Sequence, residues 1–482
     1  MSGVEKLWDI PDTWEWLNMS DLGDVVGGGT PASKEPAYWG GNINWISPAD
    51  LTGYNHKTIT KGAKSLTELG LKNCSAKVMP AGSVHFSSRA PIGYVVISSL
   101  PMSTNQGFKS LVPRDGVLNE YVYYYLKGAK QLAEKRASGT TFLELSGKAF
   151  GQLPVPLPPF DDQKRIVKKI ETLLSELDKG IESLKTAREQ LKVYRQAVLK
   201  YAFEGKLTAQ WREENKDKLE SPEQLLARIQ HEREARYQQQ LGEWKAAVKS
   251  WEVDGKEGKK PGKPTLKELV QLSENEIEQL PPLPEGYVYT YLANVGELGR
   301  GKSKHRPRND PRLFGGVYPF LQTAEVKSAS RVINSYEQTY SEFGLSQSYL
   351  WPKGTLCITI AANIAETAFL GFDACFPDSV VGFTALEGAV LPEYIELFIK
   401  AVRVRIEAYA PATAQKNINL STLESLVVPL CSIDEQKYLI EQIESRFSII
   451  EKNEAEIDAA VVRAYTLRQS ILKEAFSGEL AA

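Results

Sequence analysis

The sequence contains a tandem internal repeat with a constant spacing of 273 residues. Residues 155–207 align without a gap with residues 428–480, and 19 of the 53 aligned pairs are identical. The same spacing relates residues 10–25 (IPDTWEWLNMSDLGDV) to residues 283–298 (LPEGYVYTYLANVGEL). Two copies of one unit in tandem predict a molecule with pseudo-two-fold symmetry. Such a protein suits a ligand that offers two related sites at a fixed spacing, and duplex DNA is the commonest ligand of this kind.

Each copy of the repeat ends in a long amphipathic segment. From Asp161, which we expect to cap a helix, apolar or small residues alternate at spacings of four and three, and Gly205 stands where the helix should stop. This pattern predicts a coiled-coil seam, and because neither helix can bury its stripe alone, we expect the two helices to pair antiparallel. The seam of the first copy consists of Ile166, Ile170, Leu173, Leu177, Gly180, Leu184, Ala187, Leu191, Tyr194, Val198 and Tyr201. The second copy retains Leu439, Ile443, Ile450, Ile457, Ala460, Ala464, Leu467 and Ile471.

The segments that precede these helices, residues 1–155 and 284–428, each alternate short β-rich runs with Gly- and Pro-containing turns. A mixed or antiparallel sheet is expected in both. The predicted fold class is therefore α+β, with two α/β domains joined by two long antiparallel coiled-coil helices in a pseudo-two-fold tandem repeat. The helices are assigned to residues 156–208 and 429–482. Residues 209–283 have no counterpart at this offset within the sequence, and their composition predicts a charged helical insert followed by a flexible linker.

Composition narrows the class of protein. The chain has 482 residues and a formal net charge of −2, which argues against a protein that coats nucleic acid without specificity. A specific reader needs only a local cluster of cations, and residues 300–312 (RGKSKHRPRNDPR) supply one. No apolar run reaches about 18 residues and no signal peptide is visible, while the four cysteines form no CxxC pair. We therefore expect a cytoplasmic protein without disulfides or a zinc site.

Residues 296–303 (GELGRGKS) match the phosphate-binding loop of NTPases by letter. A functional loop of this type follows a buried strand and opens a helix. Here two prolines follow within residues 304–311, and the repeat partner, residues 23–30, contains no lysine. We expect no nucleotide site.

Other matches to catalytic motifs also lack the residues or the local structure that catalysis requires. Residues 157–160 (LPPF) resemble an amino-methyltransferase motif, but Leu157 cannot hydrogen-bond a target amine. Residues 162–164 and 435–437 mimic the (D/E)xK of metal-dependent nucleases, yet both fall in the expected first turn of a helix, where acids stabilise the helix dipole. The histidines show no triad or ligand spacing: His56, His85, His231 and His305. The sequence predicts a chain without catalytic residues of its own.

The paired helix starts (PLPPFDDQK and PLCSIDEQK), the helix ends (AFEGKL and AFSGEL) and the LTAQWR run at residues 207–212 resemble the specificity subunits of type I restriction–modification enzymes. The resemblance covers essentially the whole chain. It implies two target-recognition domains that each read one half of a bipartite double-stranded DNA site, and two helices that space them. It also implies that two methylation subunits carrying S-adenosylmethionine dock on the helices, and that restriction subunits, which use ATP and Mg²⁺, join through the methyltransferase core. No cofactor is expected on this chain itself.

Candidate DNA-binding residues are polar side chains on loops between strands, because Arg pairs with guanine and Asn or Gln with adenine. In the first domain they are Lys34, Ser88, Arg89, Asn105, Gln106, Thr140 and Thr141. In the second they are Arg300, Lys302, Lys304, Arg306, Arg308, Arg312, Gln347, Gln415, Lys416 and Asn417. Thr140, Thr141 and residues 415–417 belong to segments that resemble the GTTQKN-like sequence found near the end of recognition domains in this family.

Two other functions remain as alternatives at this point. A coiled-coil adaptor would bind protein partners and never read DNA, and the basic run at residues 300–312 argues against it. A self-contained nuclease would require metal-dependent cleavage by the chain alone.

Overall fold

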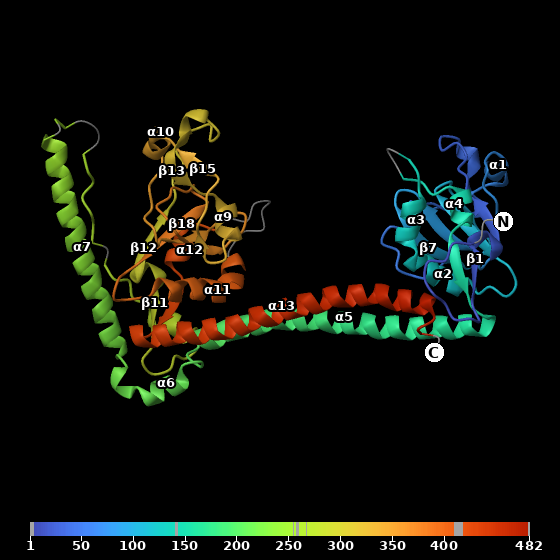
Figure 1. Cartoon of the computed structure of the whole chain (residues 1–482). Coiled ribbons are helices and arrows are strands. Elements are labelled where there is room, and N and C mark those ends of the chain that lie inside the picture. Colours follow the sequence, from blue (N-terminus) through green and yellow to red (C-terminus); the bar gives the residue numbers. More distant parts are fainter. Residues whose placement is uncertain are drawn as a thin grey trace. The chain divides into compact units, whose positions relative to one another are not determined.

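A computed structural model describes residues 4–139, 143–253, 255–256, 260–266, 268–408 and 418–480. The chain divides into two compact units (Figure 1). Unit 1 consists of residues 1–187 and 455–482, and unit 2 consists of residues 188–454. Each unit therefore contains one globular domain, called domain 1 and domain 2 below, and parts of both long helices. Within the described ranges, every helix is too short or too polar to span a bilayer.

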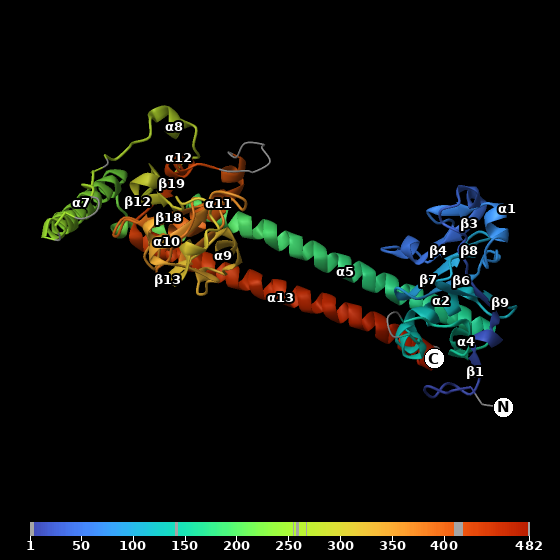
Figure 2. The same cartoon turned by 90° about the horizontal axis from the view of Figure 1, so that it is seen from above.

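The two long helices are α5 (Phe160–Phe203) and α13 (Ile433–Ser477), and they lie side by side (Figures 1 and 2). In unit 1 Arg468 of α13 contacts Asp178 of α5 at 2.6 Å, and in unit 2 Arg195 of α5 contacts Glu454 of α13 at 3.5 Å. The later residue of α5 thus contacts the earlier residue of α13, which confirms the antiparallel pairing. Helix α5 begins one residue before the expected cap Asp161. It ends two residues before Gly205, whose φ of +69° suits a left-handed helix end.

The predicted seam is correct at some positions of each helix and wrong at others. Ile166, Ile170 and Val198 are buried, as are Leu439, Ile443, Ile450 and Ile471. Tyr194, Tyr201 and Leu467, however, are each about half exposed, with Tyr194 at 51%. A heptad pattern predicts which residues share a helix face, and here the partner helix and the globular domains cover that face only at some positions.

Domain 1 is built on a five-stranded mixed sheet in the order β2-β9-β6-β7-β4, in which only β4 and β7 are parallel. Its strands are β2 (Gly23–Gly27), β4 (Thr58–Ile59), β6 (Val84–Ser88), β7 (Ile92–Ser98) and β9 (Phe108–Pro113). A three-stranded sheet contains β5 (Lys64–Leu66), β3 (Trp39–Ile46) and β8 (Ser103–Thr104). Helices α1 (Glu68–Lys72), α2 (Asn119–Gly128), α3 (Lys130–Arg136) and α4 (Gly147–Gly151) complete the domain. Helices α2 and α3 are separated at Ala129.

Domain 2 repeats this plan with the sheet order β12-β18-β16-β17-β14, again with a single parallel pair. Its strands are β12 (Gly296–Arg300), β14 (Val332–Ile333), β16 (Leu356–Thr359), β17 (Thr367–Leu370) and β18 (Val380–Ala385). The smaller sheet pairs β13 (Phe314–Phe320) with β15 (Gln338–Tyr340). The helices are α9 (Thr323–Ser328), α10 (Glu342–Ser346), α11 (Pro392–Ala408) and α12 (Leu420–Glu424). The mixed sheets confirm the predicted α+β class.

A two-stranded ladder joins the start of each domain to the segment before its long helix. In unit 1, β1 (Glu15–Asn18) pairs with β10 (Pro154–Leu157), and Glu15 faces Leu157. In unit 2, β11 (Val288–Tyr291) pairs with β19 (Val427–Leu430), and Val288 faces Leu430. Every partner in the second ladder is 273 positions beyond its counterpart in the first. The repeat seen in the sequence is therefore a repeat of strand register.

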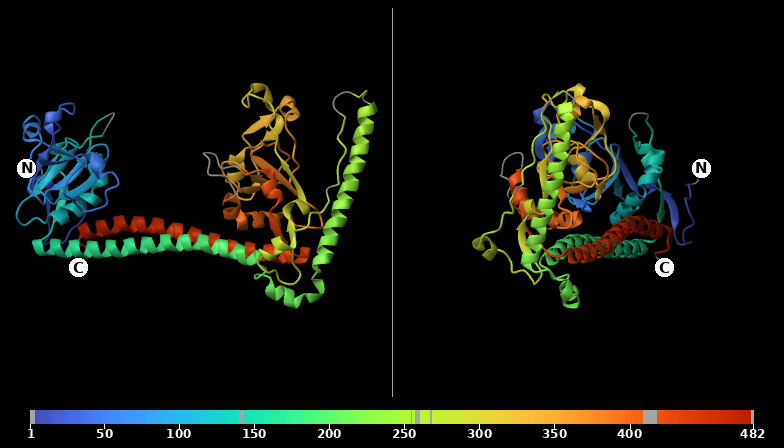
Figure 3. Two further views of the ribbon diagram at one scale, coloured as in Figure 1. Left: turned by 180° about the vertical axis from the view of Figure 1, so that it is seen from behind. Right: turned by 90° about the vertical axis from the view of Figure 1, so that its left-hand side faces the viewer.

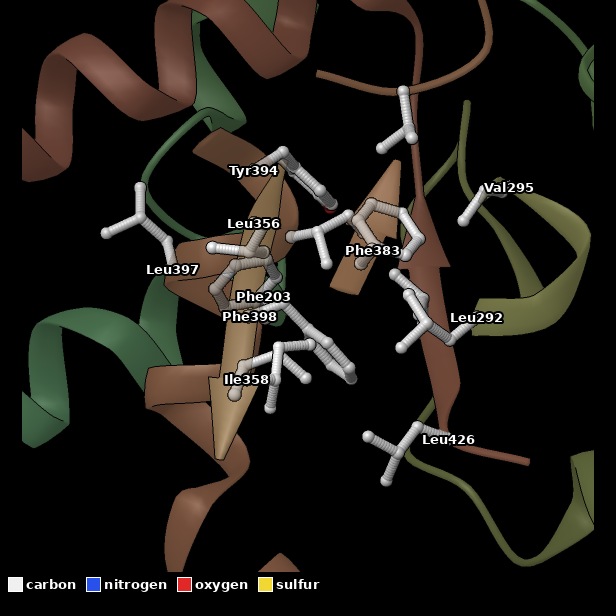
Figure 4. Close-up of a cluster of buried hydrophobic side chains, with 14 of the residues drawn as sticks. Phe203, Leu292, Val295, Leu356, Ile358, Phe383, Tyr394, Leu397, Phe398 and Leu426 are labelled. Atoms are coloured by element: carbon white, nitrogen blue, oxygen red, sulfur yellow. The ribbon is translucent and has the colours of Figure 1, made fainter. Parts of the chain in front are cut away.

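Each long helix ends in the core of the unit in which it did not begin. Phe203, in the last turn of α5, packs edge-to-face on Tyr394 and Phe398 of α11, with ring centroids 5.1 and 5.4 Å apart (Figure 4). Phe476 of α13 makes the equivalent contacts with Tyr121 and Tyr125 of α2, both at 5.2 Å. Such buried aromatic pairs add about 0.5–1.5 kcal/mol each beyond the burial of their surface.

Residues 209–283 form an arm attached to unit 2. It consists of α6 (Ala209–Glu214), the 32-residue helix α7 (Pro222–Val253), a return segment and the short helix α8 (Glu274–Glu278). Leu225 and Ile229 are the buried residues of α7. The charged insert is confirmed as helical over Pro222–Val253.

Candidate nucleic-acid interface

In domain 1 the structure brings three of the predicted residues together where β6 and β7 turn. Arg89 ion-pairs with Glu144 at 3.4 Å. Asn105 and Gln106 stand on the neighbouring loop before β9, and the carbonyl of Gly107 accepts a bond of 2.7 Å from the backbone N–H of Ser88. The Asn105 side chain accepts a bond of 2.5 Å from the Gly107 N–H, so this loop has a fixed shape. Gln106 is exposed and bonds to Thr30.

Two predicted residues of domain 1 do not join this group. Ser88 is fully buried in β6 and its hydroxyl donates to the Gly107 carbonyl at 3.1 Å, so its side chain is not on a surface that a duplex could reach. The alternation of buried and exposed positions expected for a strand fails here, because all five residues of β6 are buried. Lys34 is exposed on the loop between β2 and β3. Thr140 and Thr141 lie outside the described residues.

In domain 2 the basic run forms the connection between β12 and β13. The Lys304 N–H donates to the Gln347 carbonyl at 3.3 Å, and the Ser348 hydroxyl donates to the Lys302 carbonyl at 2.8 Å. The Lys302 ammonium lies 5.8 Å from the centre of the half-exposed Tyr349 ring. Lys302, Lys304 and Gln347, which the sequence separates by more than 40 positions, therefore share one surface. Gln415, Lys416 and Asn417 lie outside the described residues.

The cationic side chains of residues 300–312 differ in their hydrogen-bond and ion-pair partners. Arg308 contacts Asp378 at 2.9 Å, Arg312 contacts Asp310 at 2.7 Å, and Arg300 donates to the Asp378 carbonyl at 2.5 Å. The bond from Arg312 holds the pKa of Asp310 well below its usual range, and His305 bonds to the same carboxyl at 2.7 Å. Arg306 donates only to backbone carbonyls, of which that of Ser303 is 2.6 Å away. Within the described ranges, Lys302, Lys304 and Arg306 form no ion pair.

The structure also bears on the motifs that only resemble catalytic ones. Gly296–Arg300 is strand β12 itself, and the helix that a phosphate-binding loop requires does not follow it, because residues 301–310 contain no helical element. Over the residues that the structure describes, no group of three or more His, Cys, Asp or Glu side chains could hold a metal ion. His85 is buried, and desolvation lowers its pKa to about 3.

The two (D/E)xK motifs have structural roles that differ between the copies. Lys164 and Lys437 each bond to the aspartate three residues earlier, Asp161 and Asp434, so neither points toward a shared metal site. Glu435 lies in the first turn of α13, as expected, and its side chain is also fully buried. Its carboxylate accepts bonds from the Thr208 and Tyr287 hydroxyls and ion-pairs with the guanidinium in the LTAQWR run, at 2.5, 2.8 and 2.7 Å.

Some residues of these two surfaces are not among the candidate DNA-binding residues predicted from the sequence. Thr30 and Lys109 surround the Arg89 group in domain 1, since Lys109 reaches Glu144 at 3.5 Å. Tyr349 and Asp378 do the same in domain 2. Thr30 could have been found from the glycines that precede it, which signal a turn. Asp378 carries no local signal, because it reaches Arg308 only through the pairing of β12 with β18.

Comparison with known proteins gives consistent results. The family model described as "Type I restriction modification DNA specificity domain" matches residues 11–190 and 284–459. The MjaIX specificity subunit of Methanocaldococcus jannaschii is 42% identical over 185 residues, which is 38% of this chain and 42% of that protein. The chain thus spans less than half of that relative. The EcoKI specificity subunit of Escherichia coli K12 is 22% identical over 98% of this chain and 90% of its own length.

Two solved structures share the fold. The HsdS subunit of Thermoanaerobacter tengcongensis matches 98% of this chain and 99% of its own, with a TM-score of 0.56 and 14% identity. A chain from a structure titled for complex assembly and conformational transition of the type I R-M system matches 97% and 99%, with a TM-score of 0.63 and 14% identity.

Proposed function

Because this chain belongs to the type I restriction–modification DNA specificity family, we propose that its two globular domains each read one half of a bipartite DNA site. In this family the chain is a specificity subunit and not a catalytic one. The proposed task of domains 1 and 2 is target recognition. The proposed task of α5 and α13 is to hold those domains at a fixed spacing and to dock two methylation subunits.

The observation that carries this proposal is one scaffold with two different polar surfaces. The ladders β1–β10 and β11–β19 have the same register, and the aromatic contacts of Phe203 and Phe476 are equivalent. The loops differ. Domain 1 offers Arg89, Asn105 and Gln106 beside a carboxylate, while domain 2 offers a strongly basic connection between β12 and β13. Equivalent scaffolds with unlike base-reading groups suit the two unequal halves of an asymmetric site.

The long helices carry apolar side chains that their own pairing does not cover. Exposed large apolar residues on them are Phe160, Val193, Tyr194, Tyr201, Ile449, Val462, Tyr465 and Leu467. Apolar groups gathered along solvent-facing helices suit a protein interface. We assign this surface to the methylation subunits, which would bring S-adenosylmethionine. Restriction subunits, with ATP and Mg²⁺, would join through the methyltransferase core.

Domain exchange tests the proposal. Residues 1–155 are replaced by the corresponding domain of another member of the family, with Gly116, Leu118, Tyr121 and Tyr125 retained so that the contacts to α5 and α13 persist. Methylated adenines are then mapped genome-wide in a host that carries the chimera and its methylation subunit. Only one half of the methylated sequence should change, and the matched exchange of residues 284–428 should change the other half. A change in both halves, or in neither, would overturn the assignment.

A further inference from the structure

The arm of residues 209–283 lies between the two aligned copies of the repeat and belongs to neither, so the pseudo-two-fold relation does not explain it. Its first part is fixed to domain 2. Arg233 donates to the carbonyls of Ala293 and Asn294 at 3.0 and 3.1 Å, and Gln240 donates to Glu297 at 2.7 Å. Beyond Gln240 the helix continues to Val253. These 13 residues add about 20 Å of helix past the last of these contacts.

The far end of the arm is folded, and over its described residues between 243 and 263 five lysines outnumber two glutamates, Glu243 and Glu252. The Trp244 indole donates to the Pro261 carbonyl at 3.0 Å, and the Lys260 ammonium lies 6.0 Å from the centre of the Trp251 ring. These contacts hold the return segment against α7, so lysines from both segments gather at one end. The basic tip, as we call this group, consists of Lys245, Lys249, Lys256, Lys260 and Lys263. Among the described residues, none of these five lysines forms an ion pair.

The basic tip extends toward the side of domain 2 that carries α10, β13 and β15 (Figures 1 and 3). Helix α10 leads into Gln347, whose carbonyl binds the backbone of Lys304. Within unit 2, the basic tip and the proposed base-reading surface of domain 2 therefore lie on the same side. A duplex bound at that surface would continue past domain 2.

We propose that the basic tip binds the phosphate backbone of duplex DNA outside the second half-site, without reading its sequence. This inference rests on the proposed function. Lysines are suited to the role, because each is a flexible point charge that neutralises a phosphate and releases its counterion. Over its described residues unit 1 has no such arm, so the proposed contact lies on the side of domain 2.

Three duplexes and the complete complex with methylation subunits test this. The short duplex ends at both outer edges of the recognised site, and the other two extend it by about 20 base pairs past either the second or the first half-site. Extension past the second half-site should tighten binding about tenfold at low salt, whereas extension past the first should not. Replacing the five lysines by glutamine should abolish the gain and lower the salt dependence on the extended duplex by roughly 3–5 phosphates. Replacing them by arginine, the matched control, should preserve it.

The outcomes separate this inference from the one on which it rests. If the wild-type complex does not prefer its site over a scrambled duplex, the proposed function fails. If it prefers the site but both extensions act alike, or if the glutamine variant keeps the gain, only the role of the basic tip is overturned. A glutamine variant that loses ATP-dependent restriction while its flank-dependent binding is unchanged would assign the tip to a protein partner, and would also overturn the inference.

Discussion

Gln163 and Gln436 make the same three hydrogen bonds although 273 positions separate them. The Gln163 carbonyl oxygen accepts from the Leu118 N–H at 2.8 Å, and its amide donates to the carbonyls of Gly116 and Pro158. Gln436 accepts from the Leu391 N–H at 2.9 Å and donates to the carbonyls of Ala389 and Cys431. The glutamine of each DQK or EQK motif thus ties the start of a long helix to the start of α2 or α11. This shared structural role explains why both copies of the motif contain a glutamine.

Gln436→Ala should destabilise unit 2 by about 1–3 kcal/mol, because it leaves the part-buried Leu391 N–H without its partner. Chemical unfolding of the chain, followed by tryptophan fluorescence, measures the change. Gln163→Ala should cost a similar amount in unit 1. Gln190→Ala, at an exposed position of α5, is the matched control and should change stability by less than about 0.5 kcal/mol. A cost at Gln190 equal to that at Gln436 would contradict the assignment.

Unit 1 should lose stability in acid because of His85. This residue is fully buried in β6 and its Nδ1 lies 2.9 Å from the Ser110 hydroxyl. Burial lowers its pKa to about 3, against about 6.5 in the unfolded chain. Between these values the unfolded chain binds a proton that the folded chain does not. Stability is therefore complete above about pH 6.5 and falls as the pH drops toward 3, by up to about 1.4 kcal/mol per pH unit.

The second copy supplies the comparison for His85. Cys357 occupies the equivalent place in β16 and faces Gly382 as His85 faces Ser110. Melting at pH 5 and pH 7 should show a shift for the wild-type chain that His85→Gln reduces. Cys357→Ser should leave the difference between the two pH values unchanged. An undiminished shift in the His85 variant would assign the acid sensitivity to other groups.

Substitutions in the basic connection of domain 2 should weaken DNA binding, and the isolated chain should bind no nucleotide. Lys302→Ala should weaken DNA binding by the methyltransferase complex by about 1 kcal/mol and reduce the salt dependence by roughly one phosphate. Arg306→Ala should cost about 1–3 kcal/mol and relax sequence preference in the second half-site if its guanidinium is bidentate to guanine. Arg312→Ala is a useful contrast, because Arg312 is already paired with Asp310. Saturable binding of fluorescent ATP to the isolated chain would refute this interpretation.

Shortening both long helices together should change the preferred site. Deleting residues 184–190 and 457–463, one heptad at equivalent positions, shortens each helix by about 10 Å and preserves the 4-3 spacing. Methylation of a series of gapped sites should then favour a shorter spacer. Deleting four residues instead breaks the spacing and should destabilise the pair. An unchanged spacer preference after the seven-residue deletions would show that the helices do not set it.

Arg212→Met should destabilise unit 2 by about 3–5 kcal/mol, because it leaves the fully buried carboxylate of Glu435 without its cation. The double variant Arg212→Met/Glu435→Gln should recover part of this loss, since no buried charge remains. Urea unfolding of the two single variants and the double variant gives the coupling energy between the residues. A coupling energy near zero would mean that the Thr208 and Tyr287 hydroxyls stabilise the carboxylate alone.

The sequence predicted what depends on local periodicity and on repetition. The long helices, the two α+β domains and the insert follow from the spacing of apolar residues and from the 273-residue repeat. The exposed Tyr194 and Tyr201 were misplaced because a heptad pattern shows which residues share a face, but not how much of that face a partner covers. The burial of Glu435 could not be foreseen, since it depends on Arg212 and Tyr287, which only the tertiary fold brings near.

The candidate interface was less predictable than the fold. The polar loop residues predicted from the sequence include those of the Arg89 and Lys302 surfaces. They also include Ser88, which is buried in strand β6. Which cation is already neutralised is decided by long-range contacts such as that of Arg308 with Asp378. Sequence spacing alone carries no information on such pairs.

The insertion of Phe476 between Tyr121 and Tyr125 has a consequence for biosynthesis. Domain 1 is translated first, yet part of its core is supplied by the last turns of α13. At roughly 5–20 residues per second, the ribosome needs about 15–60 s to make the intervening 300 or so residues. During that time the Tyr121 and Tyr125 rings of the nascent domain lack the Phe476 ring that packs against them in the folded chain. Domain 2 never waits in this way, because Phe203 precedes it in the chain. We therefore expect the nascent first domain to need protection by a chaperone during this interval.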